Sequence, residues 1–392
     1  MMTGKHLLSA VAGASLLPLL ASAPAAAQNQ TYVDLQAGIG YSTNPDLRLN
    51  GGGSGFGRIS AYGFHGWGSE RSNSNVSAYV ENSSYLRRYG NKQLFSLNAN
   101  TTNQVTEKLS VFGNAGFSAD FGAQLSSRFF AAPVDTVPLN PVIPETSVII
   151  VNPDLAALNQ RQYRVNGLVG ASYILSPRDN LSGTVGAQRV FFKGGTVGAL
   201  DYNQYDTSLA WRRQVNERVS AGLRVIASKS DYSLGRSILT YGPQVTADVR
   251  LDENLEFGGA IGFVRTERDL GTVNRNSTDL AFDASLCRNL EYERFCGRIG
   301  RRTQTAALGA APTSSSLSAD YSRRLNARDQ IQAALAFVST GAARDVGLGR
   351  QNYYSLSGSF DRKINTRLSA GVNVAARKLT TSGPDPRADI GG

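Results

Sequence analysis

The chain has 392 residues and contains 41 glycines, 16 tyrosines and 16 phenylalanines, but only 2 cysteines and 2 histidines. Its formal net charge is +10, although charged residues make up only 18% of it and acids lie among the bases. After the first 27 residues, no stretch approaches the about 20 apolar residues that a membrane-spanning helix needs. The composition therefore argues against a helical membrane protein. The one histidine left after that point, His65, and the two cysteines also form no recognisable metal-binding set.

Residues 1–27 have the pattern of a secretory signal peptide. Lys5 supplies the positive charge, Leu7–Leu20 form the apolar region, and three alanines end at Ala27. We predict cleavage between Ala27 and Gln28, which leaves a mature chain of residues 28–392. Export removes most of the case for nucleic acid as the partner of this basic chain. Two anionic partners stay open, lipopolysaccharide on the outside and anionic solutes on the inside.

Beyond the signal peptide, apolar and polar residues alternate in runs of about ten, which is the pattern of membrane-spanning β-strands. In the first run, Val33, Leu35 and Ile39 alternate with Asp34 and Gln36. One face of such a strand meets lipid and the other meets the lumen of a barrel. The pattern predicts strands near 32–42, 54–67, 73–86, 93–104, 108–119, 161–175, 180–193, 202–214, 218–230, 239–251, 254–266, 277–288, 293–306, 315–325, 329–339, 352–363 and 367–380.

The connections between these runs alternate in length. Short charged turns such as 106–108 and 252–254 alternate with longer connections such as 194–202 and 231–238. Membrane barrels have short periplasmic turns and longer extracellular loops. Residues 388–392 predict the first part of an eighteenth strand, and 54–67 fit the alternation least well. We therefore expect an all-β protein: one transmembrane, antiparallel, up-and-down β-barrel of about 18 strands, with 16 also allowed, in the bacterial outer membrane.

The strand Val33–Gly40 runs into the sequence Tyr41–Asp46, and the hairpin rhythm covers the whole mature chain. In these features the chain resembles the β-barrel porins of Gram-negative bacteria, particularly a group of about this length in alphaproteobacteria. The resemblance implies an outer-membrane barrel and a pore. Proteins of that class usually end on an aromatic residue that the assembly machinery recognises, whereas this sequence ends Ile390–Gly392. Either the sequence is incomplete or its insertion signal is unusual.

The expected function is passive or weakly selective diffusion of small hydrophilic solutes, with anionic solutes left open. Polar lumen side chains let such solutes keep hydrogen-bonding partners along the way. The expected partners are outer-membrane lipid, lipopolysaccharide and the solutes, and homo-oligomers are left open. No nucleic acid and no cofactor are expected. Two alternatives remain: a conduit or accessory barrel for the export of a surface polysaccharide, and a structural barrel with a closed lumen.

The connection 122–160 is the longest, and it holds five prolines around the apolar stretch Ser147–Val151. Long loops without secondary structure are usually functional or disordered, and this one is too apolar for a disordered segment. One interpretation is that it folds into the lumen and narrows the pore, as the third loop of general porins does. The other is that it caps the barrel or packs on a neighbouring subunit.

The lumen-facing positions of the predicted strands collect charges of both signs. Arginine can hold a carboxylate or phosphate with two hydrogen bonds, so rings of arginine suit anion-selective pores. Ion pairs that brace a wet barrel wall are the simpler interpretation, and we favour them for most of these residues. The candidates are Arg164, Arg212, Arg224, Arg250, Arg298, Arg302, Arg324, Asp206, Asp248, Asp283 and Asp320, with Arg377, Asp34, Glu81, Asp120 and Asp361 on the same face.

The two cysteines are predicted to form a disulfide across a hairpin. A two-residue turn at 291–292 pairs Leu290 with Glu293, and counting outward places Cys287 opposite Cys296. Alternation independently places both side chains on the lumen side. Directly opposed strand residues lie about 4.5 to 5.5 Å apart at Cα, which is within reach of a disulfide. Export to an oxidising compartment favours its formation.

Enzymatic functions have little support in the sequence. Most lipases, deacylases and proteases need a histidine as general base, and His65 lies in the aromatic sequence Phe64–Trp67, which is typical of a membrane-interface belt. No glycine-rich phosphate loop precedes a predicted helix either. We therefore expect that the chain is not an enzyme.

Overall fold

The computed structural model describes residues 29–47, 51–121, 161–193, 200–269, 271, 274–303, 305, 309–342, 349–365, 368–381 and 387–391. The predicted signal peptide, its cleavage site at Ala27 and Gln28, and the long connection 122–160 lie outside these residues. Among the described residues, no helix is long and apolar enough to cross a membrane.

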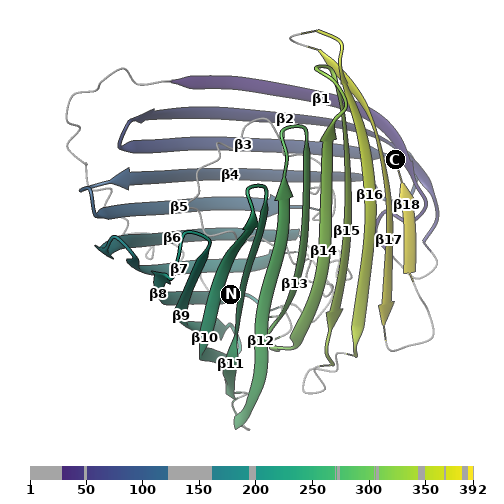
Figure 1. Ribbon diagram of the computed structural model, residues 1–392. Helices are drawn as coiled ribbons and strands as arrows, with labels where there is room; N and C mark the ends of the chain where they lie inside the picture. Colours follow the sequence, from purple (N-terminus) through teal and green to yellow (C-terminus); the bar gives the residue numbers. More distant parts are fainter. Residues whose placement is uncertain are drawn as a thin grey trace, which may run out of the picture.

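Eighteen antiparallel strands follow one another in chain order around a barrel (Figure 1). Each strand pairs with the next, and Ser42 of the first strand pairs with Gly391 of the last. The predicted up-and-down topology is confirmed, with eighteen strands rather than sixteen. They are β1 (Gln30–Ser42), β2 (Ser54–Ser69), β3 (Ser72–Tyr85), β4 (Asn91–Gln104), β5 (Leu109–Asp120), β6 (Arg161–Ser176), β7 (Asp179–Lys193), β8 (Tyr202–Gln214), β9 (Val219–Tyr232), β10 (Ser237–Asp252), β11 (Leu255–Asp269), β12 (Asn274–Asn289), β13 (Glu293–Thr303), β14 (Thr313–Arg324), β15 (Asp329–Thr340), β16 (Gln351–Lys363), β17 (Ser369–Thr381) and β18 (Arg387–Gly391).

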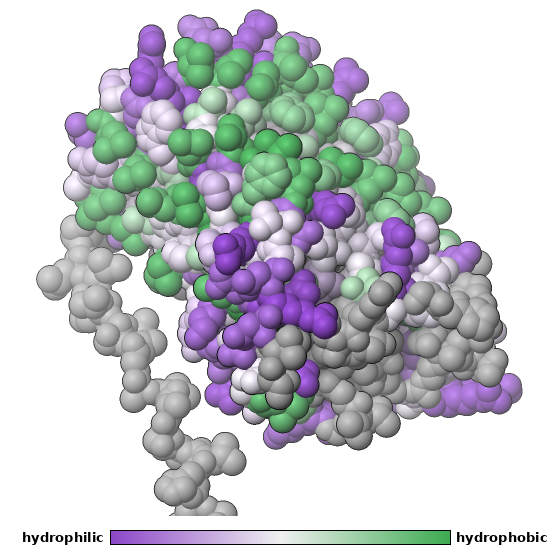
Figure 2. Space-filling model, turned by 90° about the horizontal axis from the view of Figure 1, so that it is seen from below, coloured by the Kyte–Doolittle hydropathy of each residue, from purple (hydrophilic) through white to green (hydrophobic). Residues whose placement is uncertain are grey.

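The outer face of the barrel is apolar. On β1 the side chains of Val33, Leu35 and Ile39 are 68%, 75% and 93% exposed, and the polar residues Asp34 and Gln36 lie on the opposite face. Figure 2 shows a broad field of hydrophobic residues bordered by hydrophilic ones. An apolar surface of this extent is unfavourable in water, but it suits the hydrocarbon layer of a membrane.

The short turns all lie at one end of the barrel and are closed by side chains of their own. In the β8–β9 turn, Asn216 Oδ1 accepts hydrogen bonds from the backbone N–H groups of Arg218 and Val219, both at 2.8 Å. Asn326 makes the same pair of bonds in the β14–β15 turn. Asparagine favours such turns because its side chain mimics a backbone turn. The longer connections lie at the opposite end, as the sequence predicts.

Strand β2, which fits the alternation least well, has three aromatic residues, Phe56, Tyr62 and Phe64, on the inner face, whereas Trp67 lies outside. Ile59 is 66% exposed on the outer face, whereas Ser60 on the inner face is buried. Tyr62 and Phe64 share the face of Ser60. The outer face of this strand carries several glycines instead, such as Gly63. The pairing of β2 with β1 and β3 therefore sets its orientation, and its own hydrophobic pattern does not.

Candidate functional site

The inner face of β9–β12 brings together several of the predicted charges. Arg224 of β9 donates from Nε to Gln244 of β10 at 2.8 Å and from Nη2 to Asp283 of β12 at 2.9 Å. Strand β11 lies between them and presents only Ala260 and Gly262 at the intervening inward positions. These small residues leave room for the guanidinium group to reach across. The arrangement ties four neighbouring strands together on the lumen side.

Three further ion pairs join predicted arginines to acids within the lumen wall. They are Arg212 with Asp248 at 2.9 Å, Arg298 with Asp320 at 2.6 Å and Arg250 with Glu256 at 3.8 Å. Four of the seven predicted arginines therefore pair with a carboxylate. This is the arrangement that bracing of the wall requires, and it leaves less unpaired positive charge than an anion filter would have.

The other three predicted arginines occupy different places on the wall. Arg302 of β13 interacts electrostatically with Asp283, so that one carboxylate serves two arginines. Arg164 lies on β6 near Tyr202, toward the end with the long connections. Arg324 is the last residue of β14 and lies near the turn residue Tyr292 at the other end. All seven lie at inward-facing positions of their strands, but the structure does not gather them into one ring.

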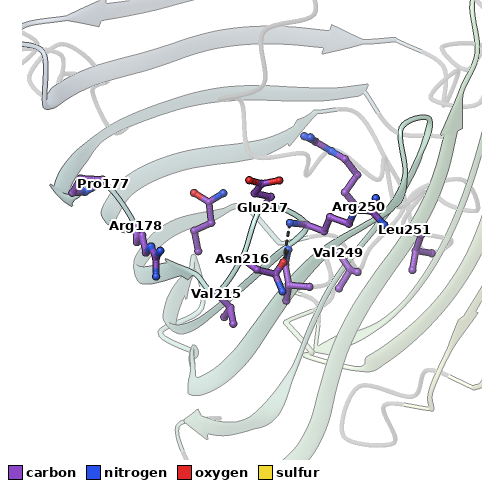
Figure 3. Close-up of a pocket in the computed structure, with 11 residues that line it drawn as sticks. Pro177, Arg178, Val215, Asn216, Glu217, Val249, Arg250 and Leu251 are labelled. Carbon is purple, nitrogen blue, oxygen red and sulfur yellow. Dashed lines mark hydrogen bonds between the residues drawn. The ribbon is translucent and has the colours of Figure 1, made fainter.

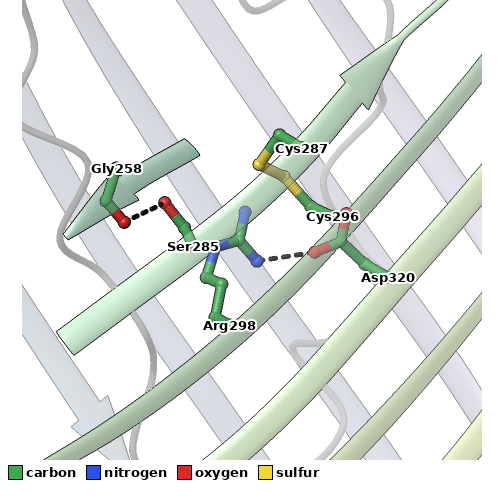
Figure 4. The surroundings of a disulfide bond; sticks show 6 residues. All are labelled: Gly258, Ser285, Cys287, Cys296, Arg298 and Asp320. Carbon is green, nitrogen blue, oxygen red and sulfur yellow. Dashed lines mark hydrogen bonds and ion pairs between the residues drawn. A yellow bond between two sulfur atoms is a disulfide. The ribbon is translucent and has the colours of Figure 1, made fainter. Parts of the chain in front are cut away.

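A disulfide joins Cys287 of β12 to Cys296 of β13 on the lumen side (Figure 4). The two residues are register partners, their Cα atoms are 4.1 Å apart, and their side chains are 7% and 0% exposed. The ion pair of Arg298 with Asp320 lies beside them. The covalent bond and the ion pair therefore brace β12, β13 and β14 at one place.

The connection after β1 folds back onto the inner wall at the long-connection end. Asp46 forms an ion pair with Lys92 of β4, and both side chains are buried. The carbonyl oxygen of Pro45 accepts a hydrogen bond of 3.5 Å from Arg377 of β17. Residues 43–47 therefore contact the wall on both sides of β1.

Leu47 fixes the end of the same segment. Its φ angle is 50°, which is the left-handed region that most residues avoid. Its side chain is buried in a cluster with Val338 of β15, Tyr353 of β16 and Leu379 of β17. In the sequence, this stretch indicates only a family resemblance. One signal in the sequence could have indicated that this segment folds inward: the turn-forming residues Asn44–Asp46 are followed by a single apolar residue, Leu47.

A second segment folds inward from the connection between β13 and β14. Thr305 and Ser230 of β9 form a hydroxyl hydrogen bond of 2.8 Å, and Arg268 of β11 donates to the carbonyl oxygen of Ala311 at 3.0 Å. Ala311 packs in a buried cluster with Val190, Tyr202, Tyr232 and Ile238. Two short segments, 43–47 and 305 with 309–312, thus occupy the inner wall at the same mouth. The sequence directed attention to the third long connection, which lies outside the described residues.

Strands β3–β8 carry a row of neutral amides, whereas the paired arginines lie on β8–β13. We call these seven lumen-facing residues the amide belt: Asn75, Asn98, Asn100, Asn114, Asn166, Gln188 and Gln204. Asp206, a predicted lumen acid, lies at the β8 end of the belt and accepts a hydrogen bond of 2.9 Å from Gln204. These amides are inconspicuous in the sequence, because no one strand carries more than two of them. Only the pairing of neighbouring strands makes them a group.

A concave surface lies at the opposite end, among the short turns (Figure 3). The backbone N–H of Gln214 donates to the carbonyl oxygen of Arg178 at 2.7 Å. The backbone N–H of Arg250 donates to the carbonyl oxygen of Arg218, also at 2.7 Å. Adjacent turns are thereby held together. Glu217 adds a negative charge to the lining, so this surface does not present one sign of charge to a ligand.

The histidine, cysteines and acids are the candidate metal ligands among the described residues. No group of three or more His, Cys, Asp or Glu residues there is placed to hold a metal ion. His65 lies on the outer face of β2, where its Nδ1 is 2.6 Å from Thr31 Oγ1 and its ring stacks on Trp67 at 5.3 Å. This position matches an aromatic belt at a membrane interface.

No family model and no curated protein matches the chain. Solved structures give broad likenesses at low identity. The FrpB iron transporter from Neisseria meningitidis is 10% identical, with a TM-score of 0.47, over 90% of this chain and 64% of its own length. The ferric citrate transporter FecA is 8% identical, with a TM-score of 0.45, and 60% of it is covered. The copper transporter OprC is 12% identical, with a TM-score of 0.42, and 75% of it is covered. The chain thus spans less than two thirds of the first two proteins, and at these values no function carries over from them.

Proposed function

We propose that the protein is a bacterial outer-membrane channel through which small hydrophilic solutes diffuse down their gradients. The observation that carries the proposal is the contrast between the two faces of the barrel. The outer face is apolar and exposed, which suits lipid, whereas the inner face carries amides, hydroxyls and ion pairs. A solute inside such a lumen can exchange its water for protein hydrogen bonds. The proposal requires no enzymatic step and no bound cofactor.

Planar-bilayer recording of the purified protein tests this function. We expect discrete conductance steps in potassium chloride, with only weak preference between chloride and potassium because four lumen arginines are paired with acids. Liposome swelling should show uptake of small sugars and amino acids. A correctly folded barrel that carries no current would contradict the proposal.

A structural barrel with a closed lumen is the second candidate, and a specific observation favours it. Residues 43–47 and 309–312 both pack against the inner wall at the same mouth. Release of one segment by mutation separates the two candidates. A channel narrowed by these segments conducts before and after release, whereas a closed barrel conducts only after it.

A further inference from the structure

Hydrogen bonds link the amide belt across β3–β6 and again across β7–β8. Asn100 donates to Asn75 at 3.0 Å, Asn114 donates to Asn100 at 2.6 Å, and Asn166 donates to Asn114 at 3.2 Å. Asn166 is the register partner of Gln188 on the next strand. The belt continues from there, because Gln188 donates to Gln204 at 3.1 Å. Six consecutive strands, β3–β8, therefore present one fixed line of amides to the lumen.

The backbone of the belt makes room for these side chains. Gly116 of β5 pairs with Asn98 of β4 and Asn166 of β6. A Cβ atom at Gly116 would lie 2.6 Å from Asn166 Oδ1 and 3.1 Å from Asn98 Oδ1. Any larger residue would push the two amides away. The line of amides crosses β5 at Asn114, and the glycine leaves the room beside it that Asn98 and Asn166 occupy.

The amides keep hydrogen-bonding capacity for a ligand. A side-chain amide has two N–H donors and an oxygen with two lone pairs. Asn100 uses one N–H toward Asn75 and one lone pair toward Asn114, and it is exposed to the lumen. One donor and one acceptor are left, both held in a fixed direction. Such a group suits a ligand whose own groups both donate and accept, which is the property of a hydroxyl.

Aromatic rings continue the belt on β1 and β2. Phe64 pairs with Ser77 of β3, which in turn pairs with Asn98. On the same inner face, the rings of Tyr32 and Phe64 stack with their centroids 5.1 Å apart, and Tyr62 lies 5.9 Å from Tyr32. Aromatic faces offer an apolar surface next to polar groups. The apolar C–H face of a sugar ring can pack on such a surface while its hydroxyls reach the amides.

From this geometry we infer that the lumen binds neutral saccharides along the amide belt, with the Tyr32–Phe64 stack at one end. The inference rests on the proposed channel function and names its solute class. Neighbouring strands are about 4.8 Å apart, so successive amides meet successive sugar units of an oligosaccharide. The belt itself carries no charge, so it favours polyhydroxylated neutral solutes over ions. The ion pairs lie on the following strands, β8–β14.

Maltohexaose is the probe for a test that has two readouts. In planar bilayers we expect it to block the ion current in a concentration-dependent manner when it is added from the short-turn side, away from segments 43–47 and 309–312. Isothermal titration calorimetry measures binding directly in lauryldimethylamine oxide, a detergent without a sugar headgroup. Polyethylene glycol of similar size controls for simple obstruction, because it lacks a hydroxyl on each unit.

The double variant Asn100→Leu with Gln188→Met removes two belt amides. Each lost hydrogen bond weakens binding about 2- to 10-fold, so the double variant should bind maltohexaose about 4- to 100-fold more weakly. Gln332→Met on β15 is the matched control, because it removes a lumen-facing amide outside the belt and should change the affinity less than twofold. The ion conductance of all three proteins should remain measurable.

The outcomes separate the two proposals. Maltohexaose that neither binds nor blocks, or that binds the double variant as tightly as the unmodified protein, overturns the saccharide inference while the channel stands. Binding of maltohexaose without any conductance overturns the channel function, whereas the saccharide site at the belt remains supported. Equal block by polyethylene glycol and maltohexaose also counts against the belt.

Discussion

Lys92 of β4 and Asp46 of the connection after β1 form an ion pair in which the two side chains are 4% and 2% exposed. The residues are 46 positions apart in the chain, so the pair fastens the connection to the wall beyond its own hairpin. The rings of Tyr85 and Tyr89 lie 5.2 and 5.8 Å from the ammonium group and add cation–π contacts. This buried ion pair is therefore one of the polar contacts that hold segment 43–47 against the wall.

Lys92→Met should release this segment and raise the single-channel conductance. Removal of one partner from a buried ion pair costs about 3–5 kcal/mol, because the remaining charge stays desolvated without its counter-charge. The segment can avoid that cost by moving Asp46 into water. The double variant Lys92→Met with Asp46→Leu replaces both charges by apolar groups and should return the conductance toward the original value. Equal conductance of the single variant and the unmodified protein would show that the segment does not narrow the pore.

The charge at position 283 should set the ion selectivity. Asp283 interacts with both Arg224 and Arg302, so Asp283→Asn leaves two arginines without their acid. The reversal potential in a salt gradient should shift toward chloride preference, and Arg224→Gln should shift it toward potassium. Asp231→Asn is the control, because Asp231 pairs with Lys229 away from the lumen charges. A shift in the same direction for Asp283→Asn and Arg224→Gln would contradict this assignment.

Labelling of free thiols tests the disulfide. We expect no reactive thiol in the denatured, unreduced protein and two after reduction, because Cys287 and Cys296 are joined. Replacement of both cysteines by serine should lower the free energy of unfolding by about 2 kcal/mol, a modest value because the enclosed loop is short. Two thiols per unreduced chain would show that the bond does not form in the exported protein.

The orientation of β1 can be tested with two adjacent arginine substitutions. Leu35 is 75% exposed on the outer face, and Gln36 next to it donates to Asp34 on the inner face at 2.9 Å. In lipid vesicles, Leu35→Arg should lower the free energy of unfolding by about 2–4 kcal/mol, as arginine does near the bilayer midplane. Gln36→Arg should have a much smaller effect, because its charge meets water and Asp34. Similar losses for both variants would argue against the membrane-spanning assignment.

The barrel was predictable because its signal repeats along the chain. Alternation such as Val33–Asp34–Leu35 indicates which face of a strand meets lipid. The short turns then set the order of the strands. The opposition of Cys287 and Cys296 followed from counting outward from one turn. In contrast, the aromatic inner face of β2 contradicts the usual alternation. The pairing with β1 and β3 decides that orientation, and no single strand reveals it.

The site was less predictable because its contacts join distant strands. The sequence indicated that Arg224 faces the lumen, but its bond to Asp283 depends on small residues at Ala260 and Gly262 of the strand between them. The inward fold of Leu47 depends on a cluster built from β15, β16 and β17. Such contacts depend on the curvature of the closed wall, and composition and periodicity do not predict that curvature.

The separation of the amide belt from the ion pairs allows two kinds of selectivity to change independently. The belt lies on β3–β8, and the paired arginines and acids lie on β8–β14. Substitutions in the belt should alter which neutral solutes are retained while the reversal potential stays the same. Substitutions among the ion pairs should do the reverse. A barrel of this kind can therefore be redesigned for a new sugar without changing its electrical behaviour.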